Sequence, residues 1–525
     1  MEKQPAGSDE QTHAIAFHRY PESFAAARKR NRQLLFIAGP TNSGKTYAAF
    51  RELMGATHGI YLAPLRLMAA EFWDRLKSEG ISCSLVTGEE RIIDPQARYI
   101  SSTIEMLAPE ADHDVAVIDE VQMIADKDRG WAWTQAIVGV NARRVILVGS
   151  ADSEPVVRAL AERLGESLEI VRTERLTPLE VASHPYHPKQ RLEAGTAVIS
   201  FSRRDVLHWK QTLGGADCAA IYGALSPEVR RNESRRFASG EARAVSATDA
   251  IGMGLNLPVK TIVFTTLEKW DGTEEITLSD SAIRQIAGRA GRYGMHESGV
   301  VTAMDWDDLK KIQHALHMPP KSLPVVAPIA PHLAMLRVLS AQSGRRDLVS
   351  LLEEFAALPE EEGLFRKADV SAMRELASMI AEIRLPLESQ FTLCVCPIDI
   401  KEKRHVRQWL HWVDSVAERI PSPLPHCRFY SPEGATSSSE KLYYAEAQVR
   451  LLAAYRWMHH RLPLLFPDAD EAAAVSHETN AFISNSLRLR VGKNCGTCGK
   501  PLRSNSRGAQ CGRCYRLQFA EEEDE

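Results

Sequence analysis

The 525-residue sequence has no uninterrupted apolar stretch near the roughly 18 residues that a membrane-spanning helix needs, so no membrane span is expected. It also has no excess of one charge, because 64 Lys and Arg stand against 68 Asp and Glu. Bulk charge therefore does not indicate a nucleic-acid partner, and any basic binding surface must be local. The first ten residues are polar and partly acidic, so we expect no signal or transit peptide and a cytoplasmic location.

Internal repeats of solenoid period are absent, and a disulfide framework is not indicated. The sequence has nine cysteines, an odd number, of which five are scattered and four form two tight pairs near the C-terminus. This distribution favours reduced thiols plus one metal site. Apolar residues at 44% and charged residues at 25% are typical of globular proteins, and the length suggests about three to four domains.

Brief apolar runs alternate with longer segments of helical pattern from about residue 34 to residue 302. Runs without polar alternation are typical of strands buried on both faces, and the segments between them suit crossover helices. The pattern predicts an α/β fold with parallel sheets, and its length predicts two such domains. We expect strands at Leu34–Ala38, Gly59–Leu62, Val115–Ile118, Val145–Val148, Ala197–Phe201, Ala244–Ala247 and Thr261–Thr265.

The texture changes after residue 306, where a Pro-rich connector leads into segments with apolar residues at spacings of three and four. We therefore expect a helical C-terminal region. The expected division of the chain is a flexible segment 1–30, α/β domains 31–172 and 173–308, a helical domain 309–487, a zinc ribbon 488–518 and an acidic tail 519–525.

The residues that follow the first expected strand match the phosphate-binding pattern G-x-x-x-x-G-K-[ST] and open a helical stretch. Glycines let backbone N–H groups surround phosphates, and the helix N-terminus adds a favourable dipole. Lys45 would place a cation at the β- and γ-phosphates of ATP, and the Thr46 hydroxyl would bind Mg²⁺. A Gly-rich turn without a ligand is the plainer alternative. The expected nucleotide-binding residues are Gly39, Pro40, Thr41, Asn42, Ser43, Gly44, Lys45 and Thr46.

An acidic pair, Asp119 and Glu120, directly follows the apolar run Val115–Ile118. Ligands of open parallel sheets bind beyond the carboxyl ends of the strands, so this pair should face the phosphate loop. We assign Asp119 to holding Mg²⁺ and Glu120 to orienting and deprotonating the attacking water. The alternative is that both acids cap a following helix.

Arg289 and Arg292 stand three residues apart beside small residues, so that they share one face of a helical turn. A permanently charged guanidinium suits the charge that spreads over a transferred phosphate, and such an arginine finger from a second domain accelerates hydrolysis. A solvated basic turn is the alternative. Asp249 and Gly252 lie in a loop after another buried run, and we expect this loop to sense both nucleotide and ligand.

A nucleotide held between two sheets predicts a machine that closes on ATP and opens after hydrolysis, which suits moving a polymer. Hydroxyls, backbone amides and arginines on loops after strands are the groups that contact a sugar–phosphate backbone. The expected nucleic-acid contacts are Pro64, Arg66, Thr103, Glu105, Ser202, Arg203 and Thr248.

Two C-x₂-C pairs, Cys495 with Cys498 and Cys511 with Cys514, are separated by 12 residues. Four thiolates at this spacing predict a tetrahedral Zn²⁺ site, against the alternative of two unrelated redox pairs. Eight basic and no acidic residues lie between residues 488 and 516, a local charge of +8. The expected role of this unit is to grip phosphates, and docking a protein is the rival role.

Several strings together resemble superfamily-two helicases, namely residues 39–46, 61–70, 85–91 and 119–124. The string 126–134 is similar in particular to the SUV-three helicases, the ATP-dependent RNA helicases of the mitochondrial degradosome and their bacterial relatives. The likeness continues at 221–227 and 285–292, is strong over about 33–305, and weakens over 330–470. The four-cysteine unit and the lack of a mitochondrial presequence depart from the family pattern.

The resemblance implies two tandem RecA-like domains followed by a helical region, and unwinding of RNA from 3′ to 5′, with DNA or hybrid duplexes as further substrates. It assigns Lys45 and Thr46 to the nucleotide and Asp119 and Glu120 to Mg²⁺ and water. The residues that it assigns to the γ-phosphate are Gln285, Arg289 and Arg292. The expected partner is nucleic acid, with a further protein partner at the zinc ribbon or the helical region, and the chain is expected to be a monomer.

Two other functions fit the same residues. One is an ATP-gated nucleic-acid clamp, translocase or remodeller that does not separate strands, and the other is a nucleic-acid-binding adaptor with an inactive ATPase. The intact Lys45, Asp119, Glu120, Arg289 and Arg292 speak against the adaptor. The motifs do not distinguish RNA from DNA, because recognition of the 2′-OH depends on individual hydrogen bonds.

Overall fold

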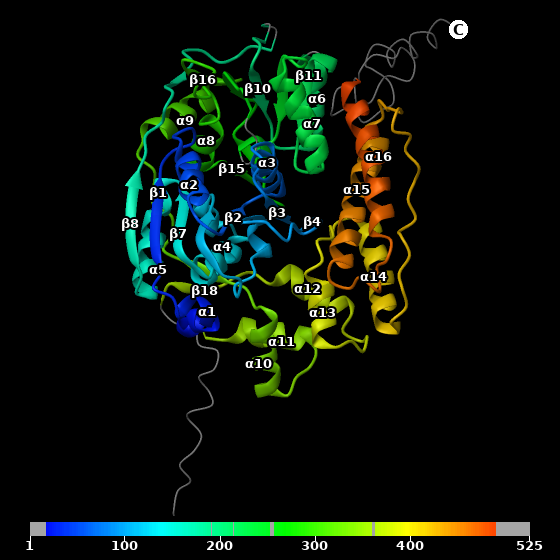
Figure 1. Cartoon of the computed structure of the whole chain (residues 1–525). Helices are drawn as coiled ribbons and strands as arrows, with labels where there is room; N and C mark the ends of the chain where they lie inside the picture. The colour runs from blue at the N-terminus through cyan, green and yellow to red at the C-terminus, as the bar shows by residue number, and fades with distance from the viewer. Residues whose placement is uncertain are drawn as a thin grey trace, which may run out of the picture.

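Two parallel sheets stand one above the other, and the C-terminal helices lie beside and below them (Figure 1). This computed structural model describes residues 17–188, 190, 192–213, 215–252, 257–359 and 363–489. The expected four-cysteine unit, apart from its first two residues, and the acidic tail lie outside these residues. The α/β part and the helical C-terminal region of the expected fold are confirmed.

The first sheet has eight strands, and all neighbouring pairs are parallel except β3 and β4. Its central strands are buried on both faces, because alternate side chains enter two separate cores. Helices α2 (Lys45–Met54) and α3 (Arg66–Ser78) cover one face, and α4 (Gly130–Gly139) and α5 (Glu154–Leu164) cover the other. The strand order is β4 (Arg91–Ile92), β3 (Cys83–Val86), β5 (Tyr99–Thr103), β2 (Gly59–Ala63), β6 (His113–Ile118), β7 (Ala142–Gly149), β1 (Gln33–Ala38) and β8 (Ser167–Arg172).

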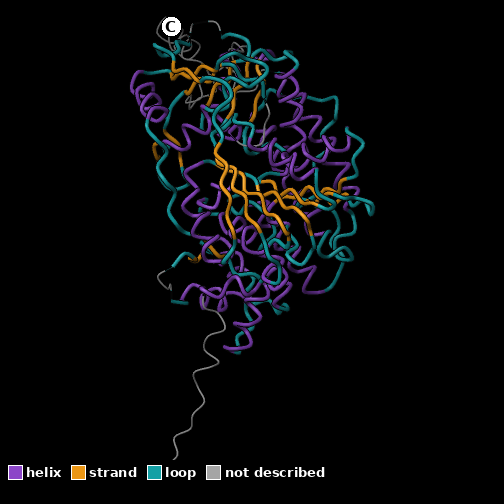
Figure 2. Tube along the Cα trace, turned by 60° about the vertical axis from the view of Figure 1, so that its left-hand side comes forward, coloured by secondary structure: helices purple, strands orange, loops and turns teal. Residues whose placement is uncertain are grey.

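The second sheet is wholly parallel, and Figure 2 shows its strands above those of the first. Helices α8 (Asp280–Ala287) and α9 (Trp306–His317) pack on one face, and α6 (Arg203–Leu213) and α7 (Pro227–Ala238) on the other. A two-stranded hairpin of β14 (Glu268–Trp270) and β15 (Glu275–Thr277) projects from this domain. The strand order is β11 (Cys218–Ile221), β12 (Ala244–Ala247), β10 (Thr196–Ile199), β13 (Thr261–Phe264), β16 (Gly299–Ala303) and β9 (Leu179–Val181).

The C-terminal region is helical apart from a short parallel pair, β17 (Ala327–Ile329) and β18 (Phe365–Lys367). Its first part shares one continuous core with the first domain, and its last two helices share a core with α6 and α7 of the second domain. No helix within the described ranges combines the length and apolar character that crossing a bilayer requires. The helices are α10 (Leu333–Ser343), α11 (Leu348–Ala357), α12 (Ser371–Met379), α13 (Leu387–Cys394), α14 (Lys403–Glu418), α15 (Ser439–His459) and α16 (Ala469–Arg488).

Two expected domain limits differ from the structure. The described part of segment 1–30 contains helix α1 (Ala25–Arg28), and Tyr20 and Phe24 beside it are buried in the core of the first domain. Helix α9 runs past the expected limit at residue 308, because its apolar face at Leu309 and Ile312 completes the core of the second domain. The sequence could not show either contact, since both depend on what packs against these segments.

Apolar runs in the sequence did not reveal the strands that carry polar residues. Thr103, expected on a loop, is the last residue of strand β5 and is buried, as is Ser101 in the same strand. Ser101 is accommodated there because its hydroxyl donates a hydrogen bond to the carbonyl of Ala69 on α3, at 2.6 Å. Apolar runs alone therefore understated the width of the first sheet.

Candidate nucleotide site between the two sheets

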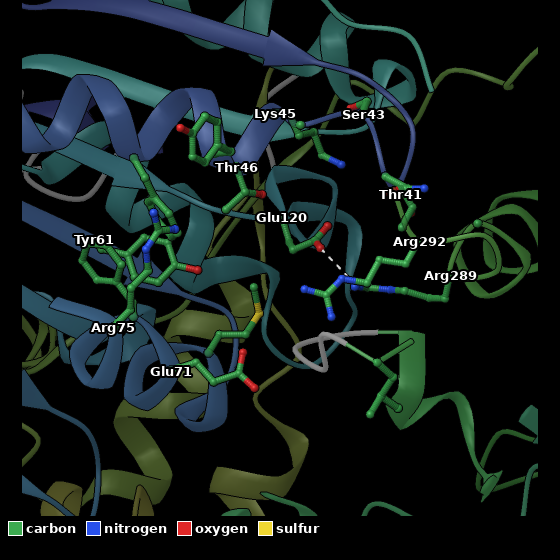
Figure 3. A pocket seen from close by; sticks show the side chains of 18 residues that line it. Thr41, Ser43, Lys45, Thr46, Tyr61, Glu71, Arg75, Glu120, Arg289 and Arg292 are labelled. Carbon is green, nitrogen blue, oxygen red and sulfur yellow. Dashed lines mark ion pairs between the residues drawn. The ribbon is translucent and has the colours of Figure 1, made fainter. Parts of the chain in front are cut away.

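A cavity of about 530 Å³ lies between the carboxyl end of the first sheet and the second domain (Figure 3). The phosphate loop forms one wall and the segment around Arg289 forms another, as the carboxyl-edge rule predicts for parallel sheets. The lining residues are Thr41, Asn42, Ser43, Gly44, Lys45, Thr46, Tyr47, Phe50, Tyr61, Met68, Glu71, Phe72, Arg75, Glu120, Leu257, Gly288, Arg289 and Arg292.

The phosphate loop joins β1 to α2 through two left-handed residues. Asn42 has φ 65° and Gly44 has φ 77°, a conformation that turns successive backbone N–H groups toward one side. The ammonium of Lys45 donates a hydrogen bond to the carbonyl of Pro40 at 3.1 Å, so the cation lies across the loop. Thr46 follows in the first turn of α2 and lines the cavity. These groups suit the phosphates of a nucleotide.

The acidic pair follows β6, and Asp119 is only 1% exposed. Its carboxylate accepts hydrogen bonds from the Tyr61 hydroxyl at 3.0 Å and from the backbone N–H of Glu120 at 2.9 Å. Burial raises the pKa of Asp119 to about 7, and the neighbouring Glu120 carboxylate adds to the rise while Lys45 opposes it. Two adjacent carboxylates with so little compensating charge fit a divalent cation, so Asp119 with the Thr46 hydroxyl would hold Mg²⁺.

The second domain contributes two arginines to the cavity. An N–H of Arg289 lies 3.8 Å from the Glu120 carboxylate (Figure 3), and its guanidinium also donates to the Gly252 carbonyl, at 3.0 and 2.5 Å. Arg292 lines the same cavity. The side-chain amide nitrogen of Gln285 is buried on α8 and has no hydrogen-bond partner among the described residues. Gln285 is not among the residues that line the cavity, so the structure does not bring this donor to the site.

A polar chain connects the acidic pair to the second domain. The Gln122 amide donates to Glu120 and its oxygen accepts from the backbone N–H of Ser150 at 3.1 Å. Ser150 in turn donates to Asp152, which also accepts from the hydroxyl of Ser281 on α8 at 2.9 Å. These hydrogen bonds connect Glu120 to α8, the helix that carries Gln285.

Asp249 does not line the cavity, although the sequence suggested that it senses nucleotide. Its carboxylate pairs with Lys269 on β14. Gly252, from the same loop, does reach the site through the carbonyl that Arg289 holds. Only part of this loop therefore has the expected place.

One end of the cavity has no counterpart among the sequence motifs. Tyr47 and Phe50 on α2 and Arg75 on α3 line it, and the Arg75 guanidinium lies about 6 Å from both aromatic rings. Glu71 on α3 lies between this end and the two arginines, and burial raises its pKa to about 7. These residues follow recognisable motifs by one or two helical turns, and the helical spacing was the signal that could have found them.

The expected nucleic-acid contacts on the first domain lie among opposite charges. Arg66 pairs with Glu89, and Arg129 pairs with Glu105 and donates to the carbonyl of Pro64 at 2.6 Å. Desolvation lowers the pKa of Arg66, with positive charge from Arg129 and from Arg456 of α15 adding to the effect. Burial lowers the pKa of Arg230 on α7, and the positive charge of Arg66 lowers it further. Arginines from the first domain, the second domain and α15 therefore lie near one another, and we call Arg66, Arg129, Arg230 and Arg456 the Arg66 cluster.

The expected contacts on the second domain have structural partners. The Ser202 hydroxyl accepts from the backbone N–H of Asp205 and so supports the start of α6. Arg203 pairs with Glu446 of α15, with N–O distances of 2.7 and 3.0 Å, and the Tyr222 hydroxyl donates to the same carboxylate. Thr248 is nearly buried and caps a short turn. Arg203 therefore fastens the C-terminal region to the second domain in this structure.

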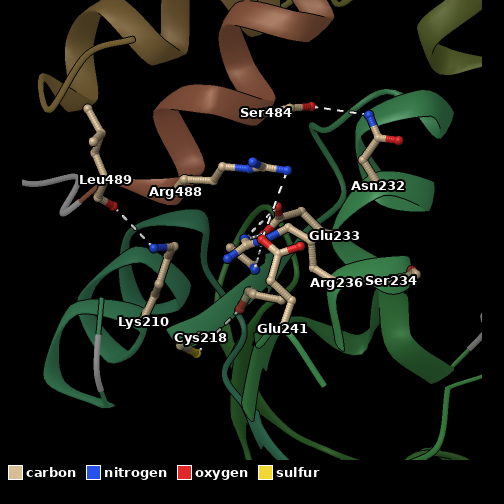
Figure 4. Close-up of polar contacts among 12 residues, drawn as sticks. Lys210, Cys218, Asn232, Glu233, Ser234, Arg236, Glu241, Ser484, Arg488 and Leu489 are labelled. Carbon is tan, nitrogen blue, oxygen red and sulfur yellow. Dashed lines mark hydrogen bonds and ion pairs between the residues drawn. The ribbon is translucent and has the colours of Figure 1, made fainter. Parts of the chain in front are cut away.

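Helix α15 also reaches the first domain. A ring nitrogen of His460, just after α15, lies 3.0 Å from the carbonyl of Glu89, and Trp457 packs where Gly88 leaves room. Helix α16 reinforces the contact with the second domain, where Ser484 meets Asn232 and Arg488 meets Glu241 (Figure 4). The C-terminal helices thus bridge both domains beside the Arg66 cluster.

Comparison with known proteins places these features in one family. The DEXQ-box helicase domain of Suv3 matches residues 21–173, the helicase conserved C-terminal domain matches 186–294, and the SUV3 C-terminal domain matches 442–489. The mitochondrial DExH16 helicase of Arabidopsis thaliana is 32% identical over 474 residues, which cover 88% of this chain and 82% of that protein. The chain belongs to the SUV3 family of ATP-dependent helicases. The resemblance stated from the motifs is confirmed.

Other members of the SUV3 family are longer. The mitochondrial ATP-dependent RNA helicase SUPV3L1 of Danio rerio is 34% identical over 89% of this chain and 63% of its own length. The mitochondrial SUV3 homologue of Caenorhabditis elegans is 34% identical over 89% of this chain and 65% of its own length. The chain therefore spans less than two thirds of these relatives. Their names correct the expectation of a cytoplasmic location, which is wrong by this comparison.

The zinc expectation has no counterpart in these matches. Cys495, Cys498, Cys511 and Cys514 lie outside the described residues and beyond the matched segment that ends at 489. Within the part of the chain that the structure describes, no group of three or more His, Cys, Asp and Glu side chains is placed to hold a metal ion. The Zn²⁺ site stays a prediction from the cysteine spacing.

Proposed function

We propose that the protein uses ATP hydrolysis to translocate from 3′ to 5′ along RNA and to separate duplexes, with DNA or hybrid duplexes as further substrates. The observation that carries the proposal is a single cavity in which Lys45 and Glu120 of one domain face Arg289 and Arg292 of the other. Chemistry in such a cavity responds to the distance between the domains, so hydrolysis can be coupled to movement. The names of the relatives support RNA as the substrate.

In the proposed reaction a water molecule attacks the γ-phosphate of ATP in line with the bond to ADP. Glu120 orients the water and accepts its proton, while Lys45 and the loop N–H groups hold the phosphates. Mg²⁺, when bound through Asp119 and Thr46, neutralises charge on the phosphate oxygens. Arg289 and Arg292 stabilise the charge of the transition state. Once the γ-phosphate has left, Arg289 and Arg292 have no anion to bind, so the two domains can separate.

The proposed polymer path lies where both domains meet α15. Arg66 and Arg129 of the first domain, Arg230 of the second and Arg456 of α15 bring positive charge there. A nucleic-acid backbone offers the phosphates that such arginines bind, and their carboxylate partners would be exchanged for phosphate on binding. We propose that the domains divide as residues 20–172, 173–317 and 318–487, with Tyr20 and Phe24 in the core of the first domain and α9 completing the second.

The test is strand displacement on RNA duplexes with either a 3′ or a 5′ overhang, beside ATP turnover with single-stranded RNA and DNA of one sequence at one stated salt concentration. We expect displacement with the 3′ overhang only. Lys45→Ala should abolish turnover while RNA binding remains, whereas Lys29→Ala, which alters an exposed lysine, should leave both unchanged. Turnover stimulated by RNA with no displacement from either overhang would favour the clamp or translocase instead.

We further propose that the four C-terminal cysteines bind one Zn²⁺ and that the surrounding basic residues add affinity for phosphates. Metal analysis should find one zinc per chain, lost in the Cys495→Ser/Cys498→Ser variant and kept in Cys427→Ser, where a lone cysteine is altered. RNA affinity should fall with the zinc. A metal-free wild-type protein would remove the zinc ribbon.

A further inference from the structure

The linker between the two domains, which joins β8 to β9, packs against the phosphate loop. The backbone N–H of Thr173 donates to the Ala38 carbonyl at 2.8 Å, and its hydroxyl donates to Ser43 at 2.9 Å. A Cβ at Gly39 would lie 2.1 Å from the Thr173 hydroxyl oxygen, so glycine is required there by the linker itself. The linker is therefore part of the wall behind the phosphate loop.

Arg175, two residues further along this linker, donates hydrogen bonds to four backbone carbonyls. One N–H reaches Thr177 at 2.6 Å in the linker. A second nitrogen donates to Thr41 of the phosphate loop at 3.1 Å and to Gly288 of the second domain at 2.6 Å, and the third nitrogen donates to Ala290. One rigid, planar guanidinium thereby joins the linker, the phosphate loop and the second domain.

Two of these carbonyls belong to Gly288 and Ala290, the residues on either side of Arg289. The Gly288 backbone also approaches the loop so closely that a Cβ there would lie 2.9 Å from the Cβ of Thr41. On the far side of the same segment, the Asn42 amide donates to the carbonyl of Gly291 at 2.7 Å. The backbone that carries Arg289 is thus held from the linker and from the phosphate loop at once.

We propose that Arg175 is a positioning residue for Arg289: it holds the backbone carbonyls of Gly288 and Ala290, the residues on either side of Arg289, against the phosphate loop. This inference rests on the proposed ATP hydrolysis. Hydrogen bonds from a charged donor are stronger than neutral ones, and desolvation lowers the pKa of the guanidinium without removing its charge. Because the four acceptors come from three segments, the contact set is complete only while the linker, the phosphate loop and the second domain keep this arrangement.

The test compares Arg175→Met and Arg175→Lys with Arg172→Met. Arg172 lies in the same part of the chain, is 63% exposed, and pairs with Glu154 across a surface, at 2.8 Å. We expect Arg175→Met to lower kcat for ATP about 10- to 100-fold with KM changed less than about 3-fold, as a displaced catalytic group does. Arg175→Lys should be intermediate, because an ammonium cannot reach all four carbonyls. Arg172→Met should match the wild type.

A double variant separates positioning from general damage. In an Arg289→Ala background, Arg175→Met should cause no further loss of kcat, since the group that it positions is gone. A loss that multiplies in that background, or an Arg175→Met variant as active as Arg172→Met, would overturn the inference.

Backbone hydrogen exchange of the peptide around residues 286–294 gives a readout that does not depend on turnover. It should quicken in Arg175→Met and stay unchanged in Arg172→Met, and unchanged exchange in both variants would also overturn the inference. A wild-type protein without ATP turnover would instead refute the proposed function, while this exchange measurement would still decide whether Arg175 holds the segment.

Discussion

Replacing Asp119 with Asn should abolish ATP hydrolysis and at the same time stabilise the empty protein above neutral pH. Asn has the shape of the protonated acid. Its oxygen can accept from the backbone N–H of Glu120, and its NH₂ group can donate to the Tyr61 hydroxyl, which now accepts. Both hydrogen bonds survive, so the substitution removes little more than the charge.

The magnitude follows from the pKa of Asp119, which rises from 3.8 to about 7. The folded state therefore holds its proton at a pH where the unfolded chain has lost it, and stability falls as pH rises from about 4 to about 7. At about 1.4 kcal/mol for each pKa unit, the cost of the charge is about 4 kcal/mol above pH 8 and under about 2 kcal/mol at pH 5. Asp119 is nearly fully buried, so solvent screening removes little of this cost.

The assay is the midpoint of thermal unfolding of the first domain, measured at pH 5 and pH 8 in buffer without Mg²⁺. At pH 8 the unfolding midpoint of the variant should exceed that of the wild type by roughly 8–16 °C, since 1 kcal/mol corresponds to about 2–4 °C for domains of roughly this size, and the difference should shrink at pH 5. Asp128→Asn, at an exposed aspartate, is the matched control and should show no pH-dependent difference. Addition of Mg²⁺ with an ATP analogue should raise the unfolding midpoint of the wild type more than that of the variant.

A difference that is the same at both pH values, or an Asp119→Asn variant that is less stable than the wild type at pH 8, would refute this reasoning. Either outcome would mean that the Asp119 charge is compensated in the empty site by more than Lys45. The assignment of Asp119 to Mg²⁺ would then lose its physical basis.

Three further predictions concern other charges. Glu120→Gln should keep ATP binding but lower kcat about 10²- to 10⁴-fold, as loss of a general base does; turnover near the wild-type rate would exclude that role. Arg203→Ala should weaken the contact between α15 and the second domain by about 3–5 kcal/mol, because it leaves the Glu446 carboxylate, which is 1% exposed, without its arginine. Hydrogen exchange along α15 should quicken in this variant but not in Arg204→Ala, which alters an exposed arginine. Glu71→Gln should lower the KM for MgATP about 5-fold at pH 8 and leave it unchanged at pH 6, because the pKa of Glu71 near 7 makes it an anion only at the higher pH; equal effects at both pH values would contradict this. The charged groups that act on Glu71 are Arg231, Arg289, Arg292 and Asp74.

The phosphate loop and the acidic pair could be predicted because local backbone geometry dictates their residues. Gly44 takes a left-handed conformation and Asp119 directly follows a buried strand, and both requirements are visible in a few adjacent residues. The α/β character and the family were readable for the same reason. The expected helical C-terminal region is also present, since amphipathic spacing is a local pattern.

Contacts made across the chain could not be predicted in this way. Nothing beside Arg203 indicates Glu446, 243 residues away, so a guanidinium expected to meet phosphate was not recognised as a fastening between domains. Arg175 has the same character, because its acceptors are backbone carbonyls that any residue supplies. Asp249 was expected at the nucleotide because it shares a loop with Gly252, whereas its own carboxylate pairs with Lys269 on β14.

Helix α15 has 21 residues and is therefore about 30 Å long. The second domain holds the first half of α15 through the buried Glu446 carboxylate and a small apolar core. The second half of α15 belongs to the core that is shared with the first domain, and His460 and Trp457 contact Glu89 and Gly88 there. Because α15 is rigid and contacts both domains, it cannot keep both sets of contacts when the domains rotate apart. Any opening of the nucleotide cleft would therefore loosen one end of this helix. Such an opening would strain either the contact between Arg203 and Glu446 or the contacts at Gly88 and Glu89, next to the charges around Arg66.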